Sequence, residues 1–444
     1  MKRFLAALLA ALGLMGTLSG CSLNLAASPE DLYTLPQLPA EYAELNHSIR
    51  QLIEAGAEYA APTAGTNLQP LQLVDLDGDG EEEALAFLRR GSDERALKIY
   101  IYERTEDGYA QSAVIEGSGT AVYSVDYRDL DGDGRQEILV SWKVGPEMQV
   151  LSVFTVRLGT PRELMNSSYI RYAAADLDGG GREEILTFRA DEQGAGTAEY
   201  YAWADDGTLV PAGMARLSMT MAELSAGQVL SGTLRGGEPA VFATGVSDSR
   251  VQVTDILALR DGELGNLTVS DSTGVSREIY RYLGLFPTDI DGDGVTELPV
   301  PEELLSSGDT ESGCRVSWRS YDAAGTGETA LSAYHALADG WYLVLPESWG
   351  EGLSVRTEGT GTDASMASFG IGAGDGRIEI LRIYTFSGEN RETQAAKGGR
   401  VLLSREGETI YSAELLEAGA FTLTEDSLRQ SFHRVSRVWS LGGN

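Results

Sequence analysis

The sequence is poor in histidine, cysteine and positive charge. Only 3 histidines and 2 cysteines occur among 444 residues, which leaves little for histidine-based catalysis or a zinc site and allows at most one disulfide bond. The 34 Lys and Arg residues face 67 Asp and Glu residues, so the formal net charge is −33. Because so acidic a surface repels phosphate backbones, nucleic-acid binding is close to excluded, and cations are the favoured partners.

The remaining composition is that of a globular protein with many tight turns. Hydrophobic residues make up 42% and charged residues 23% of the chain, which is ordinary for a protein that buries a core. The 53 glycines exceed average usage and predict frequent turns. The length allows two or three domains, or one repeat array with an appendage.

The N-terminus predicts an export signal. Two basic residues precede an almost unbroken apolar run at 4–15, which is too short for a transmembrane helix. The following Leu18-Ser19-Gly20-Cys21 resembles the lipobox of bacterial lipoproteins. The resemblance implies that 1–20 is a cleaved signal peptide, that Cys21 is lipidated, and that the mature chain is anchored to a membrane in the cell envelope, outside the cytoplasm. The alternative is an ordinary secretory signal with a chance cysteine.

An acidic loop of nine residues recurs along the chain. Its pattern is Asp-x-Asp-Gly-Asp-Gly-x-x-Glu, followed by an apolar run, and its copies begin at Asp75, Asp129, Asp176 and Asp289. The starts lie 54, 47 and 113 residues apart. The last gap holds two periods, and the segment 233–242 in its middle keeps the glycines and the apolar run without the aspartates. We therefore predict five repeats with a period near fifty.

Each repeat also carries strand signals. Apolar and polar side chains alternate over 97–101, and Asp-Gly pairs typical of tight hairpins follow such stretches at 107–108, 206–207 and 261–262. A period of about 40–50 residues with several short strands fits one blade of a β-propeller. The predicted fold is mainly β: a β-propeller with five recognisable repeats, stacked around an axis, followed by a small α+β domain.

The acidic loop has the chemistry of a calcium site. Carboxylates at positions 1, 3, 5 and 9, with the carbonyl of position 7, supply the hard oxygen ligands that Ca²⁺ prefers, and the glycines allow the chain to curl. Without a cation the carboxylates repel one another by about 4 kcal/mol per pair at ~4 Å and an effective dielectric of about 20. An EF-hand is disfavoured, because position 12 is Ala86, Val140 or Val300. The remaining alternative is a solvated turn without metal.

The loop-then-strand units resemble the FG-GAP/VCBS repeats of extracellular β-propellers, over about residues 60–335. Propellers of that family often have seven blades, so the blade number stays open. The resemblance implies these ligand sets: Asp75, Asp77, Asp79, the carbonyl of Glu81 and Glu83; Asp129, Asp131, Asp133, the carbonyl of Arg135 and Glu137; Asp289, Asp291, Asp293, the carbonyl of Val295 and Glu297.

The degenerate repeats are expected to differ. The third loop keeps Asp176, Asp178 and Glu184 but has Gly180 where an aspartate belongs. We expect it to bind an ion weakly or not at all, and we expect no ion near Thr233.

The flanks complete the predicted domains. Residues 21–40 form a tether, 41–57 a helix that packs on the propeller, 58–337 the propeller and 338–444 the α+β domain.

Within the last domain we predict strands at 341–346 and 378–386 and a helix capped by Thr424. A stripe through Leu428, Phe432, Val435 and Trp439 is expected to form one face of that helix. The Leu-Pro-Glu-Ser-Trp strand followed by sheet and helix is weakly similar to Mog1/PsbP-like domains, which implies a fold only.

No catalytic site is predicted. His47 and His433 are expected on exposed or border faces of helices, and Cys314 as a partly buried residue without a disulfide partner. A Cys314–His335 pair lacks a third group. We predict a cell-surface binding or scaffold module for an extracellular protein or glycan. The alternatives are a polysaccharide hydrolase or lyase, for which the carboxylates supply many pairs, and a purely structural envelope protein.

Overall fold

The computed structural model describes residues 42–435, apart from 107, 147, 271, 305–312, 362 and 418. The predicted signal peptide, Cys21 and the tether lie outside these residues, and so does Trp439. Within them, no helix is both long and apolar enough to cross a membrane. The chain is built mainly from antiparallel β-sheets, which confirms the predicted fold class.

Five consecutive sheets correspond to the five predicted repeats. The first contains β1 (Glu58–Tyr59), β2 (Leu71–Val74), β3 (Glu83–Arg89), β4 (Leu97–Thr105) and β5 (Gly108–Gly117). The second contains β6 (Ala121–Arg128), β7 (Glu137–Lys143), β8 (Gln149–Arg157) and β9 (Thr160–Tyr169). The third contains β10 (Arg171–Ala175), β11 (Glu184–Ala190), β12 (Gly196–Trp203) and β13 (Leu209–Arg216).

The later sheets follow the same plan with added strands. The fourth contains β14 (Gln228–Thr233), β15 (Pro239–Val246), β16 (Val251–Arg260), β17 (Glu263–Asn266) and β18 (Ile279–Arg281). The fifth contains β19 (Leu298–Glu302), β20 (Cys314–Tyr321), β21 (Gly327–Ala336), β22 (Trp341–Val344) and β28 (Phe432–Arg434). A sixth contains β23 (Leu353–Gly361), β24 (Ala364–Ile371), β25 (Ile378–Phe386), β27 (Thr409–Leu415) and β26 (Val401–Glu406).

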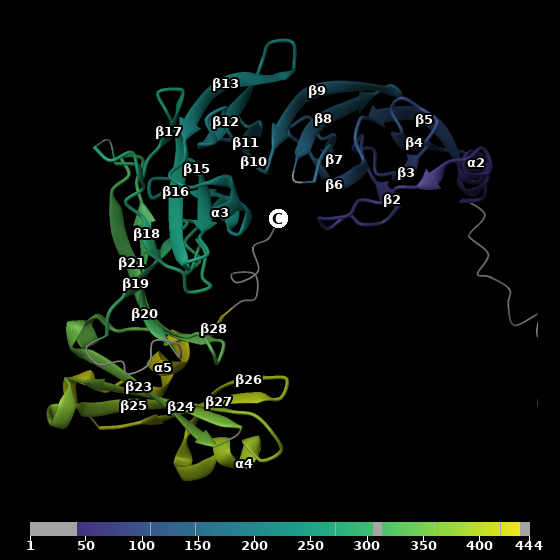
Figure 1. Ribbon diagram of the computed structural model, residues 1–444. Helices are drawn as coiled ribbons and strands as arrows, with labels where there is room; N and C mark the ends of the chain where they lie inside the picture. The colour runs from purple at the N-terminus through teal and green to yellow at the C-terminus, as the bar shows by residue number, and fades with distance from the viewer. Residues whose placement is uncertain are drawn as a thin grey trace, which may run out of the picture.

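The five repeat sheets follow one another along an arc (Figure 1). Strands β6 and β10 and the short helix α3 (Met221–Ser225) lie on its concave side, and β9 and β13 lie on its convex side. The first and fifth sheets do not meet in this view. The described sheets therefore stack like propeller blades but form an open arc, in place of the expected arrangement around a complete circle.

The strand after each loop is buried on both faces. In β3, β7 and β15 six consecutive residues are buried. Each of these strands lies inside its own sheet and is covered on both faces, by neighbouring sheets for β7 and β15 and by the second sheet and helix α2 for β3. A continuous apolar run therefore replaces the alternating pattern of a half-exposed strand. This is the physical reason why the acidic loops run into apolar segments.

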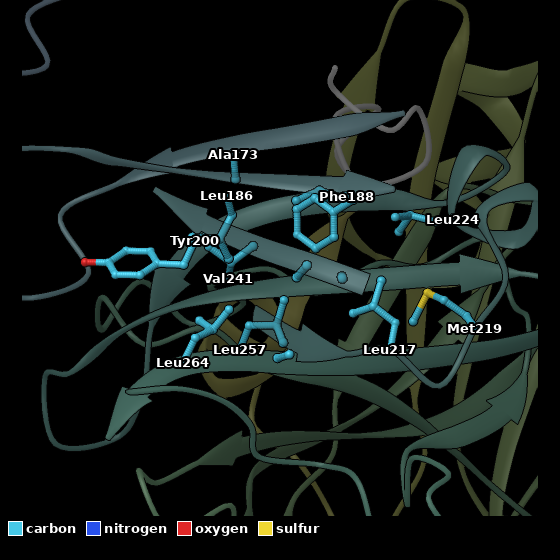
Figure 2. Close-up of a cluster of buried hydrophobic side chains, with 14 of the residues drawn as sticks. Ala173, Leu186, Phe188, Tyr200, Leu217, Met219, Leu224, Val241, Leu257 and Leu264 are labelled. Carbon is cyan, nitrogen blue, oxygen red and sulfur yellow. The ribbon is translucent and has the colours of Figure 1, made fainter. Parts of the chain in front are cut away.

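The third and fourth sheets share one core (Figure 2). Leu186 and Phe188 of β11 pack with Val241 of β15 and Leu257 of β16. Helix α3 closes this core with Leu224, and its N-terminus is fixed by a capping box between Thr220 and Glu223. Burial between sheets, which no single sheet achieves alone, holds the arc together.

The N-terminal helix is confirmed as α2 (Ala43–Glu54). Its buried residues Leu45 and Ile49 join the core of the first sheet, where Tyr102 lies. The helix ends before Gly56, whose φ of 94° is the left-handed conformation that suits a helix stop. Helix α2 therefore packs on the first repeat sheet.

Two of the three predicted Asp-Gly hairpins, at 206–207 and 261–262, lie within the described residues and are present. Gly207 lies in the turn between β12 and β13, and Asp261-Gly262 forms the turn between β16 and β17 with φ values of 52° and 81°. Two consecutive residues with positive φ match the right-handed twist of the strands that they join. Asp107 lies outside the described residues.

The C-terminal part is an α+β unit that contains the predicted strand at 378–386 and the predicted cap at Thr424, whereas the strand at 341 belongs to another sheet. The sixth sheet is accompanied by α4 (Arg391–Ala395), α5 (Glu425–Ser431) and the 3₁₀ turns η3 (Glu347–Gly352), η4 (Gly374–Gly376), η5 (Lys397–Gly399) and η6 (Gly419–Phe421). The predicted strand at 378–386 is β25, and Thr424 caps α5 by accepting from the Ser427 amide at 3.1 Å. The strand at 341 ends at Val344 and pairs with β21, so it extends the fifth repeat sheet beyond residue 337.

The helical stripe predicted beyond Leu428 is wrong. Helix α5 ends at Ser431, and Phe432 begins strand β28, which pairs with Leu343 of β22. The Phe432 ring lies 5.6 Å from the ring of Trp341 in the shared core. Tertiary pairing with the fifth sheet thus overrides the helical pattern, and His433 lies on a strand instead of a helix.

We expect Phe188→Ala to destabilise the chain by roughly 3–5 kcal/mol, because it leaves a cavity between the third and fourth sheets. Urea unfolding measures the loss. Met214→Ala, on the same sheet at 63% exposure, is the control and should stay within about 0.5 kcal/mol of the parent. Equal losses in the two variants would contradict the assigned core.

Candidate metal centres

The four acidic loops occupy equivalent places in their sheets. The loop 75–83 joins β2 to β3, 129–137 joins β6 to β7, and 176–184 joins β10 to β11. The loop 289–297 is closed by backbone hydrogen bonds between Thr288 and Glu297 ahead of β19. One local fold is therefore repeated at the same end of four sheets.

The glycines set the curl of each loop. Those at positions 4 and 6 have φ values between 73° and 89° in all four copies, a region that residues with a Cβ rarely adopt. The second glycine donates its amide to the first aspartate of the loop, for example Gly80 to Asp75 and Gly134 to Asp129, both at 3.0 Å. The chain is thus bent around its own first carboxylate.

The ninth residue fixes the other end of the loop. Glu83, Glu137, Glu184 and Glu297 are all buried where the apolar strand begins. In each, Oε2 accepts a hydrogen bond from the amide of the second loop residue, at distances of 2.8, 3.0, 2.9 and 3.1 Å. Because this hydrogen bond joins the two ends of the loop, it holds the buried glutamate close to the first loop residues.

Three carboxylates converge in every loop. Oxygens from positions 1, 3 and 9 lie within 4.8 Å of one another in these four sets: Asp75, Asp77 and Glu83; Asp129, Asp131 and Glu137; Asp176, Asp178 and Glu184; Asp289, Asp291 and Glu297. Each set could hold a metal ion. The third loop forms its set despite Gly180, so the geometry of this loop does not depend on the missing aspartate.

The fifth position does not join these sets. Asp79, Asp133 and Asp293 each accept a hydrogen bond at Oδ1 from the amide of the seventh residue, at 2.7, 3.0 and 2.7 Å. The seventh residues themselves, Glu81, Arg135 and Val295, lie on the exposed or half-buried part of the turn. Near Thr233 the fourth sheet has a tight turn in which Leu234 donates to Glu238, and no comparable acidic set forms among the described residues there.

Burial makes the converging carboxylates costly. Desolvation first, and then the neighbouring aspartates, raise the pKa of Glu83, Glu137, Glu184 and Glu297 from 4.5 to about 7. Oε1 of Glu137, Oε1 of Glu297 and Oδ1 of Asp176 are buried without a hydrogen-bond partner among the described residues. Buried polar atoms normally have partners, so these oxygens fit a divalent cation bound by hard oxygen ligands.

The guanidinium group of Arg157, on β8, forms ion pairs with two aspartates of the second loop. Its Nη2 lies 2.6 Å from Oδ2 of Asp133 and 3.3 Å from Oδ2 of Asp131. In the first loop, Nε of Arg104 forms an ion pair with the Glu81 side chain at 2.9 Å. Arg157 was not predicted from the sequence, because it lies 24 residues from Asp133 and is brought close only by the hairpin pairing of β7 and β8.

Neighbouring loops are joined directly. The amide of Gln136 in the second loop donates to the carbonyl of Leu76 in the first at 2.8 Å, and Glu183 in the third donates to Leu130 in the second at 2.7 Å. A Cβ on Gly78 would lie 2.3 Å from the carbonyl oxygen of Gly134. The first three loops therefore form a contiguous row, and the shape of one constrains the next.

The histidines and the cysteine considered as catalytic candidates lie in the core or on the surface. Nε2 of the buried His335 accepts from Nε1 of Trp318 at 3.1 Å, and burial lowers the pKa of His335 to about 3. Cys314 is its partner across β20 and β21, and burial raises the pKa of this thiol to about 12. An imidazole with so low a pKa is a weak base, and a thiol with so high a pKa forms little thiolate at neutral pH, so the pair is poorly suited to nucleophilic chemistry. His47 lies on an exposed face of α2.

Comparisons with known proteins support the repeat. Residues 75–140, which hold the first two loops, match the family described as FG-GAP-like repeat. The comparison with curated proteins finds no match.

Among solved structures, the chain is similar to exotype rhamnogalacturonan lyase YesX at 14% identity, covering 63% of this chain and 67% of that one with a TM-score of 0.27. Rhamnogalacturonan lyase YesW gives 14% identity, 63% and 68% coverage and a TM-score of 0.29. A mutant of B. megaterium levansucrase is 12% identical, and the match covers 62% of this chain and 85% of that one with a TM-score of 0.22. Likeness at this level transfers no activity.

Removal of the Arg157 guanidinium should strengthen metal binding at the second loop. We expect Arg157→Ala to raise its calcium affinity about two- to fivefold, because an exposed ion pair of about 0.5–1 kcal/mol no longer competes for the two aspartates. Calorimetric titration measures the change. Arg162→Ala is the control: it removes the same charge from the neighbouring strand β9, where Arg162 binds the carbonyls of Asp206 and Gly207. An equal gain in both variants would contradict a specific role for Arg157.

The buried glutamates also predict a pH dependence of stability in a chelator. Their pKa is about 7 in the folded chain against an ordinary 4.5, so the folded state binds these protons more tightly. The resulting stabilisation is complete below pH 4.5 and is lost as the pH rises through 7. We expect the melting temperature in EDTA to fall between pH 5 and pH 8, and to fall less steeply in Glu137→Gln. An identical slope in that variant would count against the assignment.

Proposed function

We propose that this chain is a cell-surface lipoprotein whose propeller-like repeats are braced by calcium and act as a binding or scaffold module for an extracellular glycan or protein. The observation that carries the proposal is the fourfold recurrence of a three-carboxylate loop at the junctions between sheets. Buried glutamate oxygens without partners in two of these loops support an ion there. The lipobox-like Leu18-Ser19-Gly20-Cys21 supports lipid anchoring at Cys21.

Calcium is the divalent ion that suits these loops best. Every side-chain donor in them is a carboxylate oxygen, and the carbonyls of Glu81, Arg135 and Val295 are the nearest further oxygens in the ligand pattern implied by the repeat family. Calcium accepts six to eight such ligands in flexible geometry. Extracellular calcium modules bind in the range of about 10⁻⁴–10⁻³ M, which suits a chain exported from the cytoplasm.

A binding role is proposed over catalysis because of the chemistry of the loops and histidines. The converging carboxylates sit at the junctions between sheets and are committed to structure. His335 is neutral and enclosed by aromatic rings in the core. In this proposal the acidic loops stabilise a scaffold. A partner molecule would then bind elsewhere on the surface of that scaffold.

Chelation should lower the melting temperature, and Asp131→Ala should weaken this response. At calcium levels a hundred times above Kd, each filled site adds about 2.7 kcal/mol to stability, and the variant loses one site. Scanning calorimetry with calcium and with EDTA measures both effects. Asp248→Ala, an exposed position in the turn between β15 and β16, is the matched control. Superimposable melting curves in calcium and EDTA would overturn calcium bracing.

A further inference from the structure

We infer that a cleft on the concave side of the arc is a binding site for a neutral saccharide. The inference rests on the proposed binding function and names its ligand class and its place. The cleft has a volume of about 260 Å³ and is lined by β6, β10 and β14 together with the segment 64–66. Because four successive repeats contribute to it, the cleft exists only when the sheets are stacked.

Aromatic faces line this cleft. Tyr123, Tyr169 and Tyr172 all contribute to its wall. Tyr169 and Tyr172 form an edge-to-face pair with ring centroids 5.4 Å apart. Tyr169 is buried and its hydroxyl donates to Ser141, so it supports the wall from behind. Tyr123 and Tyr172 are half-buried, and because tyrosine has an apolar ring, their rings can pack against the C–H face of a sugar ring.

Polar groups in the same wall have unused hydrogen-bonding capacity. Nη2 of Arg171 donates to the carbonyl of Ser225 at 2.8 Å, while its buried Nε has no partner among the described residues. Asp126 accepts at Oδ1 from the amide of Tyr127 at 3.0 Å. A guanidinium donor and a carboxylate acceptor in one small cleft are complementary to neighbouring hydroxyl groups, each of which both donates and accepts.

The charges of the cleft are balanced, which selects a neutral ligand. Arg128 also lines the wall, and its Nη2 forms an ion pair with Glu183 at 2.9 Å. Arg171 and Asp126 contribute one further charge of each sign. A phosphorylated or uronic-acid ligand would meet no excess of positive charge here, and the chain as a whole carries a net charge of −33, which repels anions.

An extended peptide is a poor fit along β6, because two backbone acceptors of this lining strand are already used. The carbonyl of Tyr123 accepts from the amides of Thr63 and Ala64, at 2.9 and 2.7 Å. The carbonyl of Val125 accepts from Nδ2 of Asn67 at 3.2 Å. Since strand addition depends on free main-chain groups, recognition at this cleft falls to side chains, which suits a ligand of one or two sugar rings.

The acidic loops adjoin the cleft along the chain. Arg128 immediately precedes Asp129, and Glu183, which holds Arg128, is the eighth residue of the third loop. Metal binding at these loops would therefore fix the ends of β6 and β10 and the ion pair between them. We expect saccharide affinity to be lower in EDTA than in calcium.

The test uses the mature chain in calcium and a panel of neutral di- to tetrasaccharides of glucose, galactose, mannose and xylose. Glucuronic- and galacturonic-acid oligomers serve as charged comparisons, and binding is measured by calorimetry and saturation-transfer NMR. The variants are Tyr123→Ala and Asp126→Asn. Tyr59→Ala, at 56% exposure on β1 outside the cleft, is the matched control, and melting curves establish that all variants fold.

We expect at least one neutral saccharide to bind, with affinity at least tenfold weaker in both cleft variants and unchanged in Tyr59→Ala. Saccharide binding that the cleft variants do not alter would overturn this site while leaving the proposed binding function intact. Preference for the uronic-acid oligomers would overturn the neutral ligand class. Absence of any saccharide binding by a chain that still shows calcium stabilisation would overturn the saccharide site without touching the calcium-braced scaffold.

Discussion

Like-charge repulsion inside the four acidic loops is the constraint on which the rest of this structure depends. Each loop gathers three carboxylate oxygens within 4.8 Å, at a cost of about 4 kcal/mol for each close pair at an effective dielectric of about 20. Backbone amides relieve part of this cost by donating to the first aspartate and to the buried glutamate. The rest is offset by protons at low pH or by a divalent cation, and a cation favours the ionised form of the glutamate.

This local balance matters to the whole arc because the loops lie where the sheets meet. The peptide group of Leu76 donates to Glu83 of its own loop and accepts from Gln136 of the next. A cation that fixes the glutamate therefore also fixes the contact between two sheets. The apolar cores between sheets, such as the one around Phe188 and Val241, supply most of the cohesion, and the loops set the relative position of the strand ends that line the concave cleft.

Much of the fold could be predicted from the sequence, because the repeat leaves local signals. Asp-Gly turns, apolar runs after each loop and the stripe of α2 each reflect chemistry within a few neighbouring residues. What failed depended on contacts between distant segments: Phe432 joins a strand because it pairs with Leu343 of β22. The same holds for the site. The converging sets at positions 1, 3 and 9 follow the spacing, whereas Arg157 enters the second loop only through the pairing of β7 and β8. Lipidation of Cys21 and the similarity to Mog1/PsbP-like domains stay predictions.

The central claim, that the loops are cation sites and not merely acidic turns, is tested most directly by counting bound ions. Equilibrium dialysis of the mature chain against about 1 mM calcium, followed by elemental analysis, gives the number of ions per chain. The account predicts an ion for each of the loops beginning at Asp75, Asp129 and Asp289, with a weaker additional site at Asp176. A chain that retains no calcium at this concentration, while remaining folded, would contradict the account.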